Sequence, residues 1–201
     1  MRILQEGVSR RTVIESYAKY DFQKKRNSES LPDFNEWSWS EADAIDEELH
    51  RAGLKTGIPA GYLLWNIVQI TIPDFRECAV VGGIFAGQIH RQLGLIEQNG
   101  GLANWEDKLF QHLGNRQVPS WFDYIKHGGV LADSAPFLLR PSVSSEHPAR
   151  WYVEDGSGRA VTFVANANAF GPSDAVAIAY LGTLPDPSSK FMRTRFPELL
   201  R

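Results

Sequence analysis

The chain has 201 residues, of which 43% are hydrophobic and 22% charged, and this composition excludes an intrinsically disordered chain. The length allows one domain with its own core, or a small helical part joined to a compact α/β part. The formal net charge of -3 gives the molecule no general attraction for nucleic acid, so any such binding must come from local basic patches.

The cysteine content and the first residues bear on the compartment of the protein. The single cysteine, Cys78, excludes an internal disulfide and a zinc site built from several cysteines. The opening sequence, MRILQEGVSRR, lacks the apolar core of a signal peptide, and no run approaches the roughly 18 apolar residues of a membrane span. We therefore expect a cytoplasmic protein that has no membrane partner.

The first two thirds of the chain predict helices, because apolar residues recur there at intervals of three and four. The clearest helix is EADAIDEELHRAG, for which the preceding Ser40 is the expected N-cap and Gly53 marks the end. Its Ile45 and Leu49 share one face. Weaker helices are predicted over 10–22, 59–70, 74–93, 104–113 and 119–126.

The pattern changes after Gly128 and Gly129. Short runs rich in β-branched or aromatic residues, bounded by Pro, Gly and Ser, predict strands over 136–141, 150–154 and 175–182. A helix is predicted over 159–170. We therefore expect an α+β fold, with a mainly helical region over 1–129 and a small mixed α/β unit with a C-terminal tail over 130–201, packed together.

A glycine turn joins the second of these strands to the helix. It reads Asp155-Gly156-Ser157-Gly158-Arg159. Glycines before a helix let an anion approach the unpaired backbone N–H groups, and an arginine can grip phosphate oxygens with its planar fork. Ser157 adds a hydroxyl and a potential N-cap. The four residues from Gly156 to Arg159 are therefore candidates for binding a nucleotide or phosphate-ester ligand.

Two acidic residues at the strand end are the candidate catalytic residues. Glu154 and Asp155 could hold Mg²⁺, orient Arg159 or act as a general base. The alternative is structural, because an acidic residue and glycines are common turn chemistry between a strand and a helix. In that case Asp155 and Arg159 would form a salt bridge.

The turn resembles the D-G-x-x-R signature of the ParB/sulfiredoxin superfamily, with the small Ala160 after Arg159. The order of strand, turn, helix and strand over roughly residues 130–185 agrees with this resemblance. It implies a ParB/sulfiredoxin-like fold and phosphate contacts from Gly156 through Arg159. The superfamily contains CTP-binding partition proteins, free-serine kinases and nuclease-like members, so the resemblance also implies a nucleotide ligand.

Two positions depart from the superfamily pattern. Ser157 stands where sulfiredoxins have their reactive cysteine, so we do not expect sulfiredoxin chemistry. Gly158 stands where many members carry histidine, so we do not expect a step that depends on that histidine.

Three other features leave alternatives open. The aromatic segment 34-FNEWSWS-40 could stack a base or pack onto the next helix. Cys78 could be a stabilised thiolate or a small buried hydrophobic residue. The tail after residue 181 could dock on the core, bind a partner or follow a phosphate backbone. Two basic clusters are the local patches that could bind nucleic acid. One lies around 24-KKR-26, and the other, in the tail, consists of Lys190, Arg193, Arg195 and Arg201.

Two main functions follow from these features. The first is an enzyme of phosphotransfer or phosphodiester chemistry that uses a nucleotide with Mg²⁺. The alternative is a noncatalytic module that binds a nucleotide, a nucleic acid or another protein. A third hypothesis is a structural interaction protein in which the glycine turn has no ligand.

Overall fold

A seven-stranded mixed β-sheet organises the part of the chain that the structure describes. The structure is a computed structural model, and it describes residues 1–25, 31–80, 87–88, 136–143, 149–157, 159–160, 164 and 176–201. The strand order is β1-β2-β7-β5-β6-β3-β4. The strands are β1 (Arg2–Ser9), β2 (Tyr62–Thr71), β3 (Cys78–Val80), β4 (Gly87–Gln88), β5 (Phe137–Pro141), β6 (Trp151–Asp155) and β7 (Val176–Pro185).

The sheet mixes two kinds of strand pairing. β5 runs parallel to β7 and β3 runs parallel to β6, whereas β1, β2 and β7 form an antiparallel run and β5 pairs antiparallel with β6. β5 therefore lies between β6 and β7, so the two strands that flank the glycine turn share one sheet without being neighbours.

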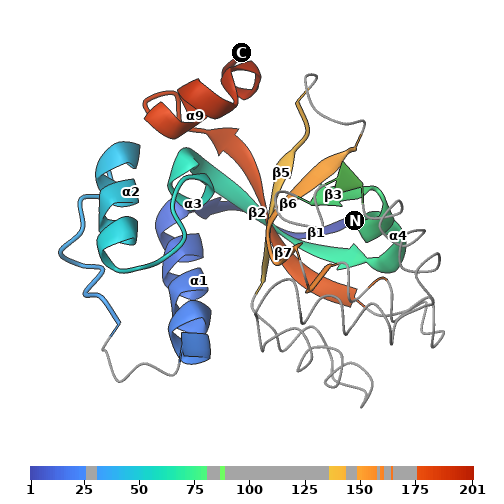
Figure 1. Ribbon diagram of the computed structural model, residues 1–201, viewed down its shortest axis with the longest axis horizontal. Coiled ribbons are helices and arrows are strands. Elements are labelled where there is room, and N and C mark those ends of the chain that lie inside the picture. Colours follow the sequence, from blue (N-terminus) through green and yellow to red (C-terminus); the bar gives the residue numbers. More distant parts are fainter. Residues whose placement is uncertain are drawn as a thin grey trace.

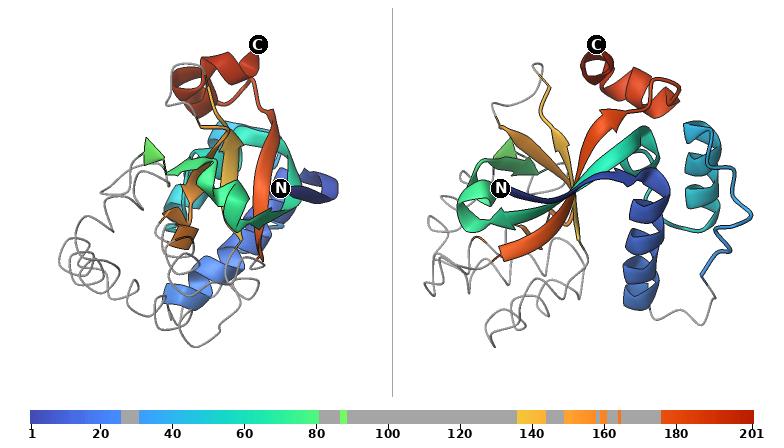
Figure 2. Two further views of the ribbon diagram at one scale, coloured as in Figure 1. Left: turned by 90° about the vertical axis from the view of Figure 1, so that its right-hand side faces the viewer. Right: turned by 180° about the vertical axis from the view of Figure 1, so that it is seen from behind.

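The described helices gather mainly on one side of this sheet (Figure 1). They are α1 (Arg10–Lys25), α2 (Ala42–Arg51), α3 (Ile58–Gly61), α4 (Ile72–Arg76), α9 (Lys190–Arg195) and the 3-10 helix η3 (Pro197–Leu200). One apolar cluster joins Tyr17 of α1 and Met192 of α9 to Trp65 of β2. A second cluster joins Ile14 of α1 to Ile45 of α2. α1 thus lies between the sheet and α2, as the right-hand view of Figure 2 shows.

The predicted helical N-terminal two thirds is wrong, because β1, β2 and β3 form within it. The segment predicted as a helix over 59–70 is mostly β2, and the one over 74–93 begins in the short α4 and continues into β3. β2 pairs on both edges, and it buries Trp65 on one face and Val68 on the other. The buried residues of β2 are Tyr62, Trp65, Val68 and Ile70. The intervals of three from Tyr62 to Trp65 and from Trp65 to Val68 are typical of a helix and not of a strand with one buried face.

Other predicted elements are confirmed. α1, β5, β6 and β7 lie where the sequence predicts them, and α2 buries Ile45 and Leu49. The N-cap of α2 is Glu41 and not Ser40, whose hydroxyl instead hydrogen bonds with that of Ser38. The segments over 104–113 and 119–126 lie outside the described residues, as does most of 159–170.

The aromatic segment and the tail both pack inside the molecule. Phe34, Trp37 and Trp39 pack against the cluster between α1 and α2. This confirms the alternative in which the aromatic segment packs inside the molecule. In the tail, Met192 is buried in the first cluster and Phe196 packs beside it. Intramolecular docking of the tail is thus confirmed.

Glycines let α9 approach the backbone of α3 closely. A Cβ atom on Gly61 would lie 2.7 Å from the sulfur of Met192, and one on Gly57 would lie 2.7 Å from the ring of Phe191. Gly57 also has a φ of 82°, which other residues rarely adopt. Larger residues at these two positions would push α9 away from α3.

A buried ion pair joins four segments of the chain at this end of the sheet. The guanidinium of Arg10 donates to the carboxylate of Asp186 at 2.7 Å, to the carbonyl of Ala60 at 2.7 Å and to that of Trp39 at 3.1 Å. Burial alone would raise the pKa of Asp186, but hydrogen bonds from Ser188 and Arg10 hold that pKa below its ordinary value. Both buried charges therefore have an opposite charge and further hydrogen bonds to offset the loss of solvation.

Replacing Arg10 with alanine should strongly destabilise the fold. Asp186 would remain buried without its cation, which costs about 3–5 kcal/mol of unfolding free energy. The control is Arg11→Ala, since Arg11 is exposed and pairs with Glu15 on the surface, where a loss of about 0–1 kcal/mol is expected. Urea unfolding at neutral pH measures both, and equal losses in the two variants would contradict the role given to Arg10.

Candidate functional site

The glycine turn follows β6 as predicted, and the backbone of the turn requires glycine at position 156. Gly156 has a φ of 89°, and a Cβ atom there would lie 2.6 Å from the ring of Phe137. The carbonyl of Gly156 accepts from the N–H of Ala160 at 2.8 Å, and the hydroxyl of Ser157 donates to the carbonyl of Val153 at 3.3 Å. Gly158 lies outside the described residues.

Arg159 is directed into the protein. Only 5% of it is exposed, and its guanidinium lies 4.5 Å from the centre of the Phe137 ring and 3.5 Å from the carboxylate of Asp155. Burial lowers the pKa of Arg159, and the nearby Asp155 and Tyr17 partly offset this effect. This geometry is that of a structural ion pair and not of an arginine at the mouth of a cleft.

Glu154 is held by another buried arginine. The Arg140 guanidinium donates to the Glu154 carboxylate at 2.6 Å, and the two side chains are 1% and 8% exposed. Arg140 also lies 4.4 Å from the ring centre of Tyr152 and 4.0 Å from that of Phe196. Glu154 thus ties β6 to β5, and through Arg140 to the tail, which leaves it poorly placed as a general base.

The structure adds a residue to the turn that the sequence does not indicate. The ammonium group of Lys55, in the loop after α2, donates to the carbonyl of Glu154 and lies 3.8 Å from the carboxylate of Asp155. Lys55 and Asp155 remain 30% and 24% exposed. No local motif marks Lys55, because a hundred positions separate it from the turn. Asp155 thus lies between the cations of Lys55 and Arg159, and Glu154 is paired with Arg140. Mg²⁺ at these carboxylates stays a prediction.

Removal of the Arg159 side chain should destabilise the protein. Asp155 would keep only Lys55 and the Phe137 ring would lose its cation, so we expect Arg159→Ala to cost about 1–3 kcal/mol, between the values for exposed and buried pairs. Chemical unfolding compares it with Arg51→Ala, which removes an exposed guanidinium. A fully stable Arg159→Ala protein would return this arginine to the list of phosphate-binding candidates.

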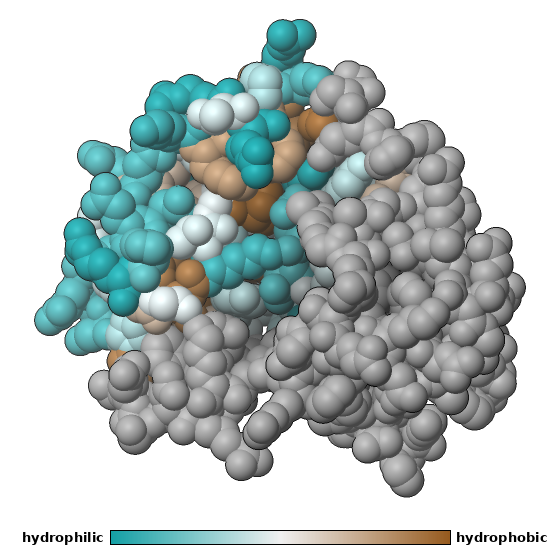
Figure 3. Space-filling model, viewed as in Figure 1, coloured by the Kyte–Doolittle hydropathy of each residue, from teal (hydrophilic) through white to brown (hydrophobic). Residues whose placement is uncertain are grey.

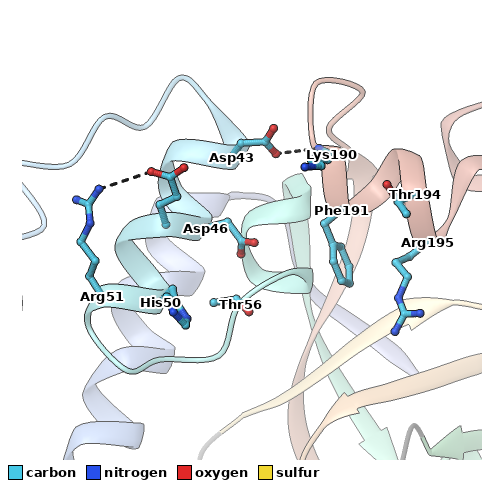
Figure 4. A pocket seen from close by; sticks show the side chains of 10 residues that line it. Asp43, Asp46, His50, Arg51, Thr56, Lys190, Phe191, Thr194 and Arg195 are labelled. Atoms are coloured by element: carbon cyan, nitrogen blue, oxygen red, sulfur yellow. Dashed lines mark hydrogen bonds and ion pairs between the residues drawn. The ribbon is translucent and has the colours of Figure 1, made fainter.

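An open cleft lies elsewhere, between α2 and α9. Its volume is about 890 Å³, a size typical of ligand sites. Its lining residues are Asp43, Asp46, Glu47, His50, Arg51, Thr56, Lys190, Phe191, Thr194 and Arg195. Figure 3 shows hydrophilic side chains around this region with hydrophobic surface between them, and Figure 4 shows the lining side chains of α2 and α9 from close by. The residues predicted from the glycine turn do not line this cleft.

The α2 wall of the cleft is acidic. Asp46 lies four residues before His50 on α2, and its carboxylate accepts from the N–H of Gly57. Burial raises the pKa of Asp46, the Gly57 hydrogen bond opposes this, and the neighbouring Asp43 raises it further. A carboxylate in a cleft with its pKa shifted by burial and by a neighbouring charge is common in functional sites. The Asp43 carboxylate is occupied by the backbone N–H of Lys190 at 2.8 Å.

The α9 wall is basic and aromatic. Lys190 and Arg195 are exposed, and within the described parts of the chain neither side-chain cation has a hydrogen-bond or ion-pair partner. Phe191 lies between them on the helix, with its ring against Gly57. Two unpaired cations beside an aromatic ring are suited to an anionic group on an organic ligand.

Two earlier candidates resolve within the described residues. Cys78 is fully buried in β3, and burial raises the pKa of its thiol to about 12, with Asp74 and Glu77 adding to the effect. The small hydrophobic alternative is therefore confirmed. Among the described His, Cys, Asp and Glu side chains, no group of three or more is placed to hold a metal ion.

Comparisons of the chain with protein-family models, with curated proteins and with solved structures found no match. The helices that the structure describes include none that is long and apolar enough to cross a membrane. The resemblance to the ParB/sulfiredoxin superfamily stays a prediction.

Neutralising Asp46 should not destabilise the protein. An Asn side chain can still accept from the Gly57 N–H but carries no buried charge. Because the pKa of Asp46 is raised in the folded state, its contribution to stability is present at low pH and is lost as the pH rises through that pKa. Asp46→Asn should therefore melt above the wild type at pH 7, with the gap closing in acid.

Glu47→Gln is the control for this measurement, since Glu47 is exposed on the same helix and should change stability by no more than about 0.5 kcal/mol. A lower melting temperature of Asp46→Asn at pH 7 would show that the charged carboxylate stabilises the fold.

Proposed function

We propose that this protein is a noncatalytic binding module that takes a phosphate ester, such as a nucleotide, in the cleft between α2 and α9. The observation that carries the proposal is a pair of cations, Lys190 and Arg195, that have no partner among the described residues and line one wall of a cleft of about 890 Å³. Arginine and lysine at such a position make charge-assisted hydrogen bonds to phosphate oxygens, which are stronger than neutral ones. Phe191 adds an aromatic surface for the organic part of the ligand.

A binding role fits better than phosphotransfer, because the candidate catalytic carboxylates are engaged. Glu154 is paired with Arg140, and Asp155 lies between Lys55 and Arg159. Both carboxylates already have cationic neighbours, which makes them less suited to take a proton from a nucleophile or to coordinate a metal.

The glycine turn is the second candidate for the phosphate site, and it keeps one supporting observation. Lys55 brings a partly exposed cation to the turn, so the turn has more positive charge than its own sequence provides. A phosphate there would have to displace Asp155 from Lys55 or Arg159, and this competition disfavours the turn relative to the cleft.

The two sites can be separated by titration. Inorganic phosphate and a panel of nucleotides would be titrated calorimetrically into the wild type and into Arg195→Gln. Losing one charge-assisted hydrogen bond of about 1.5–3 kcal/mol should weaken binding roughly 10- to 100-fold. The matched control is Arg193→Gln, since Arg193 is exposed on the same helix but does not line the cleft, and its effect should stay within about twofold.

Other outcomes would contradict the proposal. Loss of binding in Arg159→Lys with full binding in Arg195→Gln would move the site to the turn, because lysine keeps the charge but loses the planar fork. Binding to polynucleotides that weakens steeply with salt and requires Arg193 as well as Arg195 would favour a nucleic-acid surface on the tail.

A further inference from the structure

The two walls of the cleft carry opposite charge, and within the described parts of the chain each wall has a charged group that lacks an ion-pair partner. On the α9 wall these are the cations of Lys190 and Arg195. On the α2 wall the Asp46 carboxylate has no bond beyond the Gly57 N–H among the described residues, so one of its oxygens remains free to accept. Glu47 follows Asp46 on the same helix and also lines the cleft, and its exposed carboxylate lies 3.6 Å from the Arg51 guanidinium.

A plain phosphate would use only half of this cleft. It would satisfy the α9 cations but would bring further negative charge toward Asp46 and Glu47, which disfavours binding. The cations do not pair with these carboxylates in the structure. The cleft is therefore suited to a ligand that carries both a negative and a positive charge.

We propose that the preferred ligand of the cleft is a phosphate ester that also carries an ammonium group. Its phosphate contacts Lys190 and Arg195, and its ammonium group contacts Asp46 with support from Glu47. This inference rests on the proposed function, because it assigns the substrate class of the same site. It makes the acidic α2 wall the element that distinguishes such a ligand from a nucleotide, which has no cationic group at neutral pH.

The proposed contact between Asp46 and an ammonium group agrees with the local environment of this carboxylate. An ammonium group in contact would favour the charged carboxylate and offset the burial and the Asp43 repulsion that raise its pKa. Asp43 itself is already bonded to the Lys190 backbone, so it is not the first contact for the amine. The charged or titratable groups that line the cleft with Asp46 are Asp43, Glu47, His50 and Arg51 of α2 and Lys190 and Arg195 of α9. The loop before α3 also contacts Asp46, through the N–H of Gly57.

The test is a titration of matched compounds. A series of ω-aminoalkyl phosphates of increasing chain length would be compared with alkyl phosphates of the same length, which lack the amine. The best aminoalkyl phosphate should bind about tenfold tighter than the alkyl phosphate of the same length, as expected for one added charge-assisted contact. The series is needed because the chain length selects the compound that spans both walls.

The variant Asp46→Asn should have opposite effects on the two classes. Affinity for the aminoalkyl phosphate should fall about tenfold, whereas affinity for the alkyl phosphate should stay equal or improve, because a repelling charge is removed. Simple loss of folding would weaken both classes together. The control is Glu48→Gln, which removes an α2 carboxylate that does not line the cleft and should leave both affinities within about twofold.

The outcomes separate this inference from the proposed function. If alkyl and aminoalkyl phosphates bind equally and both require Arg195, the inference fails and the proposed function stands. If the amine preference survives in Asp46→Asn, Glu47→Gln and the double variant, the inference also fails. If no phosphate compound binds, both fail.

A last arm distinguishes a soluble ligand from a lipid headgroup of the same chemistry. Vesicles that contain phosphatidylethanolamine would be sedimented with the wild type and with Arg195→Gln. Pelleting that depends on Arg195 would assign the site to the headgroup, and binding of only the soluble compounds would assign it to a free phosphorylated amine.

Discussion

The buried pairing of Arg10 with Asp186 is the interaction on which the helical side of the molecule depends. It joins the start of α1, the loop before α2, the short α3 and the turn that leads into α9. These segments are far apart in the sequence and cannot hold one another by local bonds. A buried charge pair has a strict geometry, because each charge is costly without its partner, so it specifies how the segments meet.

The cleft is a consequence of that arrangement. Its walls belong to α2 and α9, which approach through different contacts: α2 packs on α1, and α9 packs on α3 across Gly57 and Gly61. The Asp43 bond to the Lys190 backbone joins the walls at one point. Since both helices are anchored to the same core, the opposite charges of the two walls are held apart and stay available to a ligand.

Buried arginines bear on the choice between a phosphate-binding and a structural role for the glycine turn. Arg140 and Arg159, like Arg10, are at most 5% exposed, and each is compensated by a carboxylate. A guanidinium can grip a phosphate or an internal carboxylate with the same fork, so its chemistry alone does not decide between these roles. The burial of Arg159 beside Phe137 and Asp155 favours the structural role for this residue.

The sequence by itself determined the local elements whose periodicity is unambiguous. It predicted α1, α2 and the strands β5, β6 and β7, and it placed the glycine turn after β6. It did not predict β2, because intervals of three between buried residues of this strand also fit a helix. Only the tertiary structure brought Lys55 to Asp155 and placed Asp46 opposite Arg195, because contacts between distant residues depend on how the elements pack and leave no periodic signal along the chain.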